Sequence, residues 1–249
     1  MNNRIGILDS GLGGLSILKE LKKVLPNEDY LFYEDSINNP YGSKSDVELL
    51  KIVSNNVDFL LKNDCKIIVI ACNTATTSCI NSLREMYPNT IFVGTVPAIK
   101  MAYDLNYKNT IILSTPYTMN SKRVGELIDE YHNSDQNIIN ISGENLANLI
   151  ENEKYDDIDL LLKRLLGPYR DKCDSIVLGC THYPLIRDII QKFVPNAKLL
   201  DGSLGVALEV KHQLTINNLL NTRESLGNIE IINSKDDTLV DRSFEILNK

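Results

Sequence analysis

The feature that most constrains the fold of this chain is the alternation of short apolar runs with helical patterns along its 249 residues. Nearly continuous apolar runs of this length are typical of strands buried on both faces, and such strands form parallel sheets covered by helices. We therefore predict an α/β fold of doubly wound parallel sheets. The predicted strands are Arg4–Asp9, Tyr30–Asp35, Lys66–Ala71, Thr90–Gly94, Asn109–Ser114, Asn137–Ile141, Ser175–Gly179, Lys198–Asp201 and Asn228–Ile232.

Two of the intervening helices carry clear end signals. Leucines recur at three- and four-residue steps from Leu15 to Leu25, and Pro26 ends the pattern. Ser45 and Glu48 form a capping box at the start of a second helix. The apolar face of that second helix consists of Leu49, Leu50, Val53, Val57, Leu60 and Leu61.

The composition predicts a packed core and argues against nucleic acid as a partner. Hydrophobic residues make up 43% of the chain, far more than disordered proteins contain. The net charge is −7 and the basic residues are scattered, so no surface for nucleic-acid phosphates is expected. No apolar run reaches the roughly 18 residues of a membrane span, and no signal peptide is visible. We expect a cytoplasmic protein, no nucleic acid or membrane partner, and five reduced cysteines.

A segment with two cysteines occurs twice in the chain. Residues 65–74 (CKIIVIACNT) and 173–182 (CDSIVLGCTH) both read Cys, polar residue, apolar strand, small residue and second Cys, followed by hydrogen-bonding residues that open a helix. Each contains the third of four successive predicted strands. We infer two similar α/β halves, each with one thiol, Cys72 or Cys180, at the carboxyl end of an inner strand, where open α/β sheets bind ligands. We interpret Cys65, Cys79 and Cys173 as buried packing residues.

The positions of Cys72 and Cys180 favour acid–base chemistry. At the start of a helix, free N–H groups and the helix dipole stabilise a thiolate and can also bind a carboxylate. A metal site or a redox disulfide would favour closely spaced cysteines, which this chain lacks. Two equivalent thiols instead fit a reaction that inverts a stereocentre, because each face of the carbon then needs its own acid or base. Racemisation by two thiols and without a metal is therefore the favoured interpretation.

Polar residues at neighbouring strand ends are candidates for supporting groups. Asp9 precedes a glycine-rich segment whose backbone N–H groups can approach a ligand closely, although a solvated turn also explains an aspartate there. Tyr41 and Gly42 follow Pro40 in a turn that can present backbone groups to the same edge, and turn chemistry alone also explains this tripeptide. His182 is the one histidine close in sequence to a candidate catalytic cysteine.

In these segments the chain resembles the glutamate racemases of the aspartate/glutamate racemase family. The matching motifs occur in the family's order and spacing across nearly the whole chain, and the two cysteine motifs are specific as a pair. They are DSGLGGL at residues 9–15, PYG at 40–42, ACNTA at 71–75 and LGCTHYPL at 178–185.

The resemblance implies a two-lobed fold, with the active site between two pseudo-symmetric parallel-sheet lobes. It places residues 1–96 and 206–249 in the first lobe and residues 97–205 in the second. It also implies a cytoplasmic homodimer that uses no cofactor, neither pyridoxal phosphate nor metal. The implied reaction interconverts L- and D-glutamate and supplies D-glutamate for peptidoglycan.

The resemblance further implies roles for individual residues. Cys72 and Cys180 match the two acid/base catalysts, and Asp9 and His182 match residues that assist them. Glu151 matches a further carboxylate near the second thiol. The positions that match substrate-binding residues are Asp9, Ser10, Tyr41, Gly42, Asn73, Thr74, Thr181 and His182.

Some positions depart from the family pattern. Glu34 stands where a glycine often precedes Asp35, Asn38 where an arginine is frequent, and Tyr117 where a glycine is usual. We expect these residues at the rim of the site. They weaken the prediction of the substrate and of Thr118 as a contact residue, but not that of the two cysteines.

Three other interpretations stay open. The first is an aspartate or broad-specificity racemase of the same family. The second is a dinucleotide-binding module, since the glycines after Asp9 follow a strand and Glu34 and Asp35 end the next one, although Ser16 replaces the third glycine. The third is a two-lobed amino-acid-binding receptor, which would keep Asn73 and Thr74 but would have no use for two matched thiols.

Overall fold

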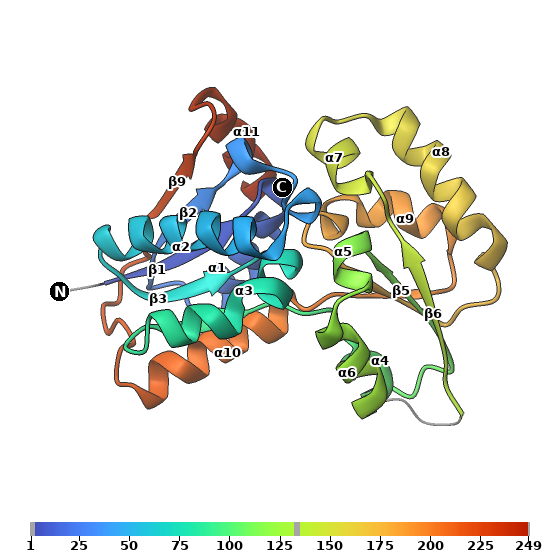
Figure 1. The fold of residues 1–249 in the computed structure, drawn as a ribbon, viewed down its shortest axis with the longest axis horizontal. Helices are drawn as coiled ribbons and strands as arrows, with labels where there is room; N and C mark the ends of the chain where they lie inside the picture. Colours follow the sequence, from blue (N-terminus) through green and yellow to red (C-terminus); the bar gives the residue numbers. More distant parts are fainter. Residues whose placement is uncertain (1–2, 132–134, 249) are drawn as a thin grey trace. The chain divides into compact units, whose positions relative to one another are not determined.

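The described residues form nine strands in two parallel sheets, one in each of two units (Figure 1). The computed structural model describes residues 3–131 and 135–248. The first unit comprises Met1–Thr95 with Ser203–Lys249, and the second comprises Val96–Gly202. The predicted class of doubly wound parallel sheets is thereby confirmed.

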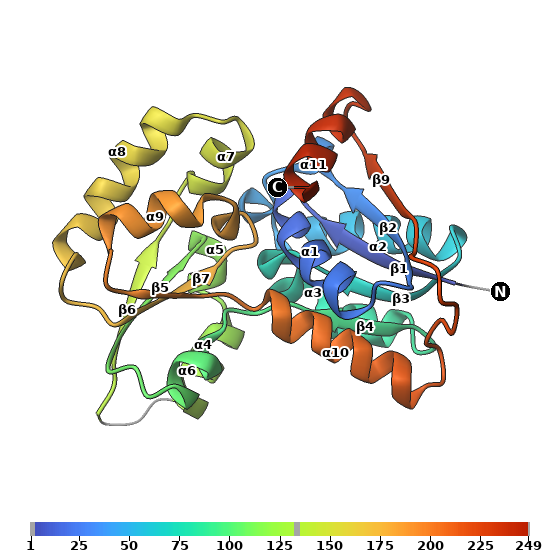
Figure 2. The ribbon, with the colours of Figure 1, turned by 180° about the vertical axis from the view of Figure 1, so that it is seen from behind.

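The first unit contains a five-stranded sheet in the order β4-β3-β1-β2-β9. Its helices cover both faces: Figure 1 shows α2 and α3 in front of the sheet, and Figure 2 shows α1, α10 and α11 on the opposite face. The strands are β1 (Arg4–Asp9), β2 (Asp29–Glu34), β3 (Cys65–Ile70), β4 (Ile91–Gly94) and β9 (Ile229–Asn233). The helices are α1 (Leu15–Val24), α2 (Asp46–Lys62), α3 (Asn73–Met86), α10 (Ser203–Ile216) and α11 (Thr238–Asn248).

The second unit contains a four-stranded sheet in the order β6-β5-β7-β8. One apolar cluster includes Ile158 and Leu162 of α8 and Ile190 of α9, and another includes Ile99 of α4 and Val124 of α6. The strands are β5 (Asn109–Ser114), β6 (Asn137–Ser142), β7 (Ser175–Gly179) and β8 (Lys198–Leu200). The helices are α4 (Ile99–Asp104), α5 (Pro116–Met119), α6 (Lys122–Tyr131), α7 (Leu146–Glu151), α8 (Tyr155–Leu166) and α9 (Arg187–Phe193).

The internal repeat of the sequence is also a repeat of strand order. The first four strands of the chain lie in the order β4-β3-β1-β2, and the next four lie in the corresponding order β8-β7-β5-β6. β3 and β7 are therefore equivalent inner strands, each with one cysteine at or just before its start and another just after its end. β9 extends only the first sheet, beside β2.

The local patterns of the sequence locate the elements well. Each of the nine predicted strands is present, with ends that differ by at most one residue from the prediction. Helix α1 begins at Leu15 and stops before Pro26. The Ser45 side chain accepts a hydrogen bond from the Glu48 backbone at the start of α2, as the capping pattern predicts.

The carboxyl ends of β1, β2 and β3 meet at one edge of the first sheet. The Asp35 N–H donates to the Asp9 carbonyl at 2.8 Å, and the Ala71 N–H donates to the Leu8 carbonyl at 2.8 Å. In the second sheet the Gly143 N–H donates to the Ser114 carbonyl in the same manner. Backbone pairing thus brings together the segments that follow each strand.

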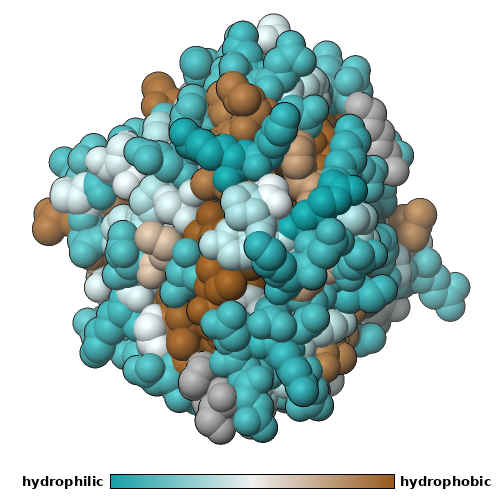
Figure 3. All heavy atoms as spheres, turned by 90° about the vertical axis from the view of Figure 1, so that its right-hand side faces the viewer, coloured by the Kyte–Doolittle hydropathy of each residue, from teal (hydrophilic) through white to brown (hydrophobic). Residues whose placement is uncertain are grey.

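The face drawn in Figure 3 carries mostly hydrophilic side chains, and its hydrophobic side chains gather in a band. Large apolar side chains such as Leu160 and Leu226 are well exposed, which is ordinary for a folded protein. Within residues 3–131 and 135–248, none of the helices has the length and apolar character needed to cross a membrane.

A buried ion pair stabilises the amino-terminal side of the first sheet. Lys66 Nζ lies 2.6 Å from Glu28 Oε2, and both side chains are almost inaccessible to solvent. Lys66 also donates to the Leu219 carbonyl, and the other Glu28 oxygen accepts from the Asn221 N–H. These bonds hold the connection between α10 and β9 against the sheet.

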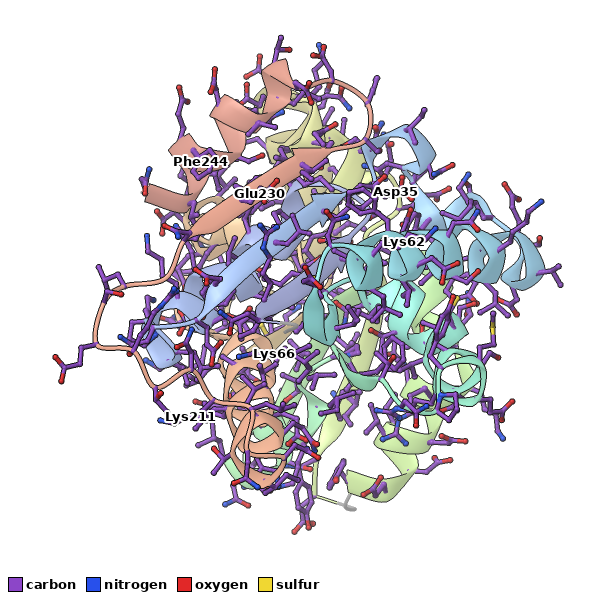
Figure 4. The ribbon with its side chains drawn as sticks, turned by 90° about the vertical axis from the view of Figure 1, so that its left-hand side faces the viewer. Asp35, Lys62, Lys66, Lys211, Glu230 and Phe244 are labelled. Atoms are coloured by element: carbon purple, nitrogen blue, oxygen red, sulfur yellow. The ribbon has the colours of Figure 1, made fainter. Side chains whose placement is uncertain are left out.

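Substitution of Lys66 by Met should destabilise the protein by about 3–5 kcal/mol, because the Glu28 charge stays buried without its partner. Urea unfolding measures the loss. Lys62→Met is the matched control on the nearby exposed end of α2 (Figure 4) and should change stability by less than about 0.5 kcal/mol. Equal effects of the two substitutions would contradict the assignment, as would a Lys66→Met/Glu28→Leu double variant less stable than Lys66→Met alone.

Candidate active site

Cys72 is the N-cap residue of α3, two residues after β3 ends. Its side chain is buried in the first unit, and Ser10 Oγ lies 3.9 Å from its sulfur atom. Asn73 and Thr74, also buried, form the first turn of the helix. A thiol in this position lies at the first turn of the helix, where the backbone N–H groups and the positive end of the helix dipole favour an anion.

Asp9 binds Ser10, whose hydroxyl lies beside the Cys72 sulfur atom. Its carboxylate is fully buried at the end of β1 and accepts the Ser10 N–H at 2.6 Å and the Ser10 hydroxyl at 3.4 Å. The segment that follows packs closely on Asp9, since a Cβ atom on Gly14 would lie 2.8 Å from the Asp9 Cβ and 2.7 Å from the Phe32 ring. A glycine at position 14 is therefore required for this close approach.

Tyr41 lies in the same apolar cluster as Cys72, and its hydroxyl is bound within the protein. The hydroxyl donates to Asp35 Oδ2 at 2.7 Å, and Asn56 Nδ2 donates to both the hydroxyl and the same carboxylate oxygen. Burial, together with the negative charge of Asp35, raises the pKa of Tyr41 well above its usual value. Tyr41 therefore stays a neutral donor, while Gly42 beside it is exposed.

Cys180 belongs to a second group of side chains, which lies wholly in the second unit. Its sulfur atom lies 3.8 Å from His182 Nδ1, and His182 Nε2 lies 2.6 Å from Glu151 Oε2. Glu151 is the last residue of α7, and its side chain is 17% exposed, whereas His182 is almost completely buried. The fold thus aligns a thiol, an imidazole and a carboxylate, with Thr181 buried beside them.

The pKa of His182 reflects competing effects. Burial by itself lowers it, but the hydrogen bonds to Cys180 and Glu151 outweigh burial and hold the pKa well above the usual 6.5. The raised pKa favours the protonated ring, which lies between the Cys180 sulfur and the Glu151 carboxylate.

The surroundings of Cys180 correct one expectation from the sequence. We expected both thiols where a helix begins, yet Cys180 is followed by Thr181 and His182, and a short 3₁₀ turn begins only at Tyr183. Pro184 lies in the first positions of that turn, and α9 starts at Arg187. The helix-dipole argument therefore applies to Cys72, whereas the group beside the Cys180 sulfur is His182.

One of the residues that depart from the family pattern, Glu34, also differs from expectation. Glu34 does not lie at a rim: it is fully buried and accepts hydrogen bonds from Asn233 and Ser243. Asn38 donates to both Asp35 carboxylate oxygens. Both acidic residues at the end of β2 are thus bound by side chains of their own unit, which argues against their use for a nucleotide ribose. Tyr117 is half-buried on α5, beside the fully buried Thr118.

Two further buried polar residues, one in each unit, were not singled out from the sequence. Asn56 lies on the apolar face of α2 between Val53 and Leu60, and a polar residue within an apolar face is a signal that could have identified it. Tyr183 is fully buried after Cys180 and donates to the Gly143 carbonyl at 3.2 Å. A Cβ atom on Gly143 would collide with its hydroxyl, but only the folded chain brings these two residues together.

All five cysteines are buried free thiols. In the part of the chain that the structure describes, no three His, Cys, Asp or Glu side chains are grouped in a way that could hold a metal ion. The described ionisable groups near the two thiols include Asp9, linked to Cys72 through Ser10, and the His182–Glu151 pair beside Cys180.

Known proteins resemble this chain over nearly its whole length. A family model described as Asp/Glu/Hydantoin racemase matches residues 29–205. A glutamate racemase of Clostridium perfringens is 39% identical over 241 residues, which are 95% of this chain and 92% of the relative. One of Clostridium botulinum is 41% identical over 250 residues, covering 98% and 96% of the two chains.

Solved structures show the same similarity. The glutamate racemase of Francisella tularensis, in complex with D-glutamate, superposes with a TM-score of 0.84 at 29% identity, covering 100% of this chain and 94% of the other. The Escherichia coli glutamate racemase, in complex with L-glutamate and the activator UDP-MurNAc-ala, has a TM-score of 0.83 at 25% identity, covering 97% and 95%.

The raised pKa of His182 predicts a pH-dependent contribution to stability. A histidine whose pKa is higher in the folded than in the unfolded protein stabilises the fold. This stabilisation is fully present below the unfolded-state pKa, about 6.5, and is lost as pH rises through the folded-state pKa. His182→Asn should therefore destabilise the protein more at pH 6 than at pH 9 in urea unfolding. Glu151→Gln should lower the midpoint of the His182 ring titration followed by NMR, and an unchanged midpoint would contradict the role of this pair.

Proposed function

Because the chain belongs to the Asp/Glu/Hydantoin racemase family and is an amino-acid racemase, we propose that it interconverts L- and D-glutamate without a cofactor, using Cys72 and Cys180 as the two acid/base groups. One observation carries this proposal. Cys72 and Cys180 follow equivalent inner strands of two sheets with the same strand order, and each has its own polar support. The similarity to glutamate racemases is the basis for glutamate as substrate.

The proposed reaction is a transfer of two protons. The thiolate of one cysteine takes the α-proton, which breaks the Cα–H bond and forms an S–H bond. The thiol of the other cysteine then gives its proton to the opposite face of the same carbon, so that the handedness inverts and nothing is oxidised or reduced. Following the family resemblance, Cys180 acts on L-glutamate and Cys72 acts on D-glutamate.

The two thiols are activated differently. The His182 imidazolium stabilises the Cys180 thiolate, and Glu151 keeps the ring protonated and oriented. At Cys72 the start of α3 supplies positive potential, and the Ser10 hydroxyl links the sulfur to the Asp9 carboxylate. His182 and Asp9 are accordingly the groups that we propose return each thiol to its starting protonation state.

The remaining substrate-binding positions follow the same proposal. Asn73 and Thr74 in the first turn of α3, and Thr181 after Cys180, hold the polar groups of the amino acid, together with the backbone of Tyr41 and Gly42. Helix N–H groups suit a carboxylate. Without a cofactor to delocalise the developing negative charge, positioned donors must stabilise it, and each positioned acid or base typically contributes 10²–10⁴-fold.

In the cell, this activity supplies D-glutamate for peptidoglycan in the cytoplasm, where buried thiols stay reduced. The second candidate, racemisation of aspartate or of several amino acids, concerns the same site and the same chemistry. Circular dichroism distinguishes them, since loss of optical signal from L-glutamate but not from L-aspartate identifies the preferred substrate.

The wild-type protein should racemise L- and D-glutamate with no added cofactor, and should keep this activity after dialysis against EDTA. Cys72→Ser and Cys180→Ser should each lower the rate by about 10²–10⁴-fold, because serine is a far weaker acid than cysteine. Cys173→Ser is the matched control at the other end of β7 and should keep nearly full activity. Full racemase activity in the Cys72 or Cys180 variant would refute the two-thiol mechanism.

The family resemblance also implies a homodimer, and we propose this as the assembly in solution. Light scattering after size-exclusion chromatography should give twice the mass of one chain. A mass that stays at one chain across a wide range of protein concentrations would contradict it.

A further inference from the structure

Asp35 is the centre of a buried hydrogen-bond network at the end of β2. Its carboxylate is inaccessible to solvent and accepts hydrogen bonds from four side chains. The donors are the Tyr41 hydroxyl at 2.7 Å, Asn56 Nδ2 at 2.7 Å, Asn38 Nδ2 at 2.9 and 3.0 Å, and the Ser234 hydroxyl at 3.2 Å. Figure 4 shows Asp35 at the end of its strand.

Burying such a network costs free energy, so the question is what the network does for the structure. Removing a carboxylate from water costs free energy, and all four donors to Asp35 are neutral groups. Apolar residues in place of both the carboxylate and its donors could fill the same volume without this cost. A fully satisfied polar network, in contrast, specifies one arrangement of the segments that it joins.

The segments joined by Asp35 belong to the proposed active site of the first unit. Its N–H donates to the Asp9 carbonyl, and its carboxylate holds the Tyr41 hydroxyl. The Tyr41 ring packs in the same cluster as Cys72. Asp35 therefore links the end of β1 to the turn that carries Tyr41 and Gly42.

The carboxyl-terminal part of the chain completes this network. Just after β9, the Ser234 hydroxyl donates to Asp35 and accepts the Ile37 N–H at 3.0 Å. The Ser234 N–H donates to the Glu34 carbonyl at 2.9 Å. Asn233 Nδ2 donates to the Glu34 carboxylate at 2.8 Å and to Ser36 Oγ at 2.9 Å. Asn233, the last residue of β9, and Ser234 thus hold four successive residues, from Glu34 to Ile37.

Glu34 extends the same network to the last helix. The Ser243 hydroxyl of α11 donates to Glu34 Oε1 at 2.6 Å, and both residues are fully buried. A glycine at position 34, as the family pattern favours, could not make this bond. The connection between α11 and the end of β2 therefore depends on the glutamate side chain at position 34.

We propose that the carboxyl-terminal segment, Ile229–Asn248, positions the Tyr41–Gly42 turn for substrate through Ser234, Glu34 and the buried carboxylate of Asp35. This inference rests on the proposed function. Asp35, Glu34, Ser234 and Ser243 are positioning residues: they act on the substrate through the turn and take no proton in the reaction.

The experiment measures KM and kcat for L-glutamate in Ser234→Ala and Ser243→Ala. A loosened turn weakens substrate binding, so each variant should raise KM about 3–10-fold with a smaller change in kcat. Ser234→Thr keeps the hydroxyl and should restore a KM close to that of the wild type. Ser54→Ala, on α2 and outside the network, is the matched control and should leave both constants unchanged.

A double-variant comparison separates positioning from a general loss of stability. If Ser234 acts through Asp35 on the turn, Ser234→Ala combined with Tyr41→Phe should be about as impaired in kcat/KM as the worse single variant. Losses that multiply would overturn the proposal, and so would wild-type kinetic constants in both alanine variants. A wild-type protein inactive on glutamate would instead refute the proposed function. Ser243→Ala, which is remote from the turn, decides the question if Ser234→Ala does not fold.

Discussion

The parallel pairing of β1 with both β2 and β3 is the constraint on which the rest of the first unit depends. Because parallel strands end at the same edge, residues far apart in the chain, such as Asp9, Asp35 and Cys72, are delivered to one region by backbone hydrogen bonds alone. The same rule operates in the second sheet, where β5 and β7 are paired in the equivalent way. The repeat therefore yields two thiols in corresponding positions.

The two halves nevertheless support their thiols by different physical means. Cys72 begins a 14-residue helix and relies on the helix end and on the Ser10–Asp9 pair. No α-helix begins at Cys180, and the buried His182 ring, whose pKa is raised and which is held by Glu151, lies beside its sulfur atom instead. A repeat in fold thus need not be a repeat in electrostatics.

The strands and the positions of the two cysteines were predictable because they depend on local patterns. Apolar runs, end signals and the repeated cysteine segment each lie within a dozen residues. The hydrogen-bond partners of Glu34 were not predictable, since Asn233 and Ser243 lie about 200 residues further along. The short turn after Cys180 was also missed, because Pro184 fits the start of an α-helix as well as a 3₁₀ turn.

The sequence alone determined the α/β class, the alternation of strands and helices, and the placement of Cys72 and Cys180 after equivalent strands. These follow from side-chain hydrophobicity and local backbone preferences, which act over short distances along the chain. Only the tertiary structure decided which groups surround each thiol, the raised pKa of His182, and the link from α11 to Asp35. Those properties depend on burial and on contacts between distant segments, which exist only once the sheets have formed.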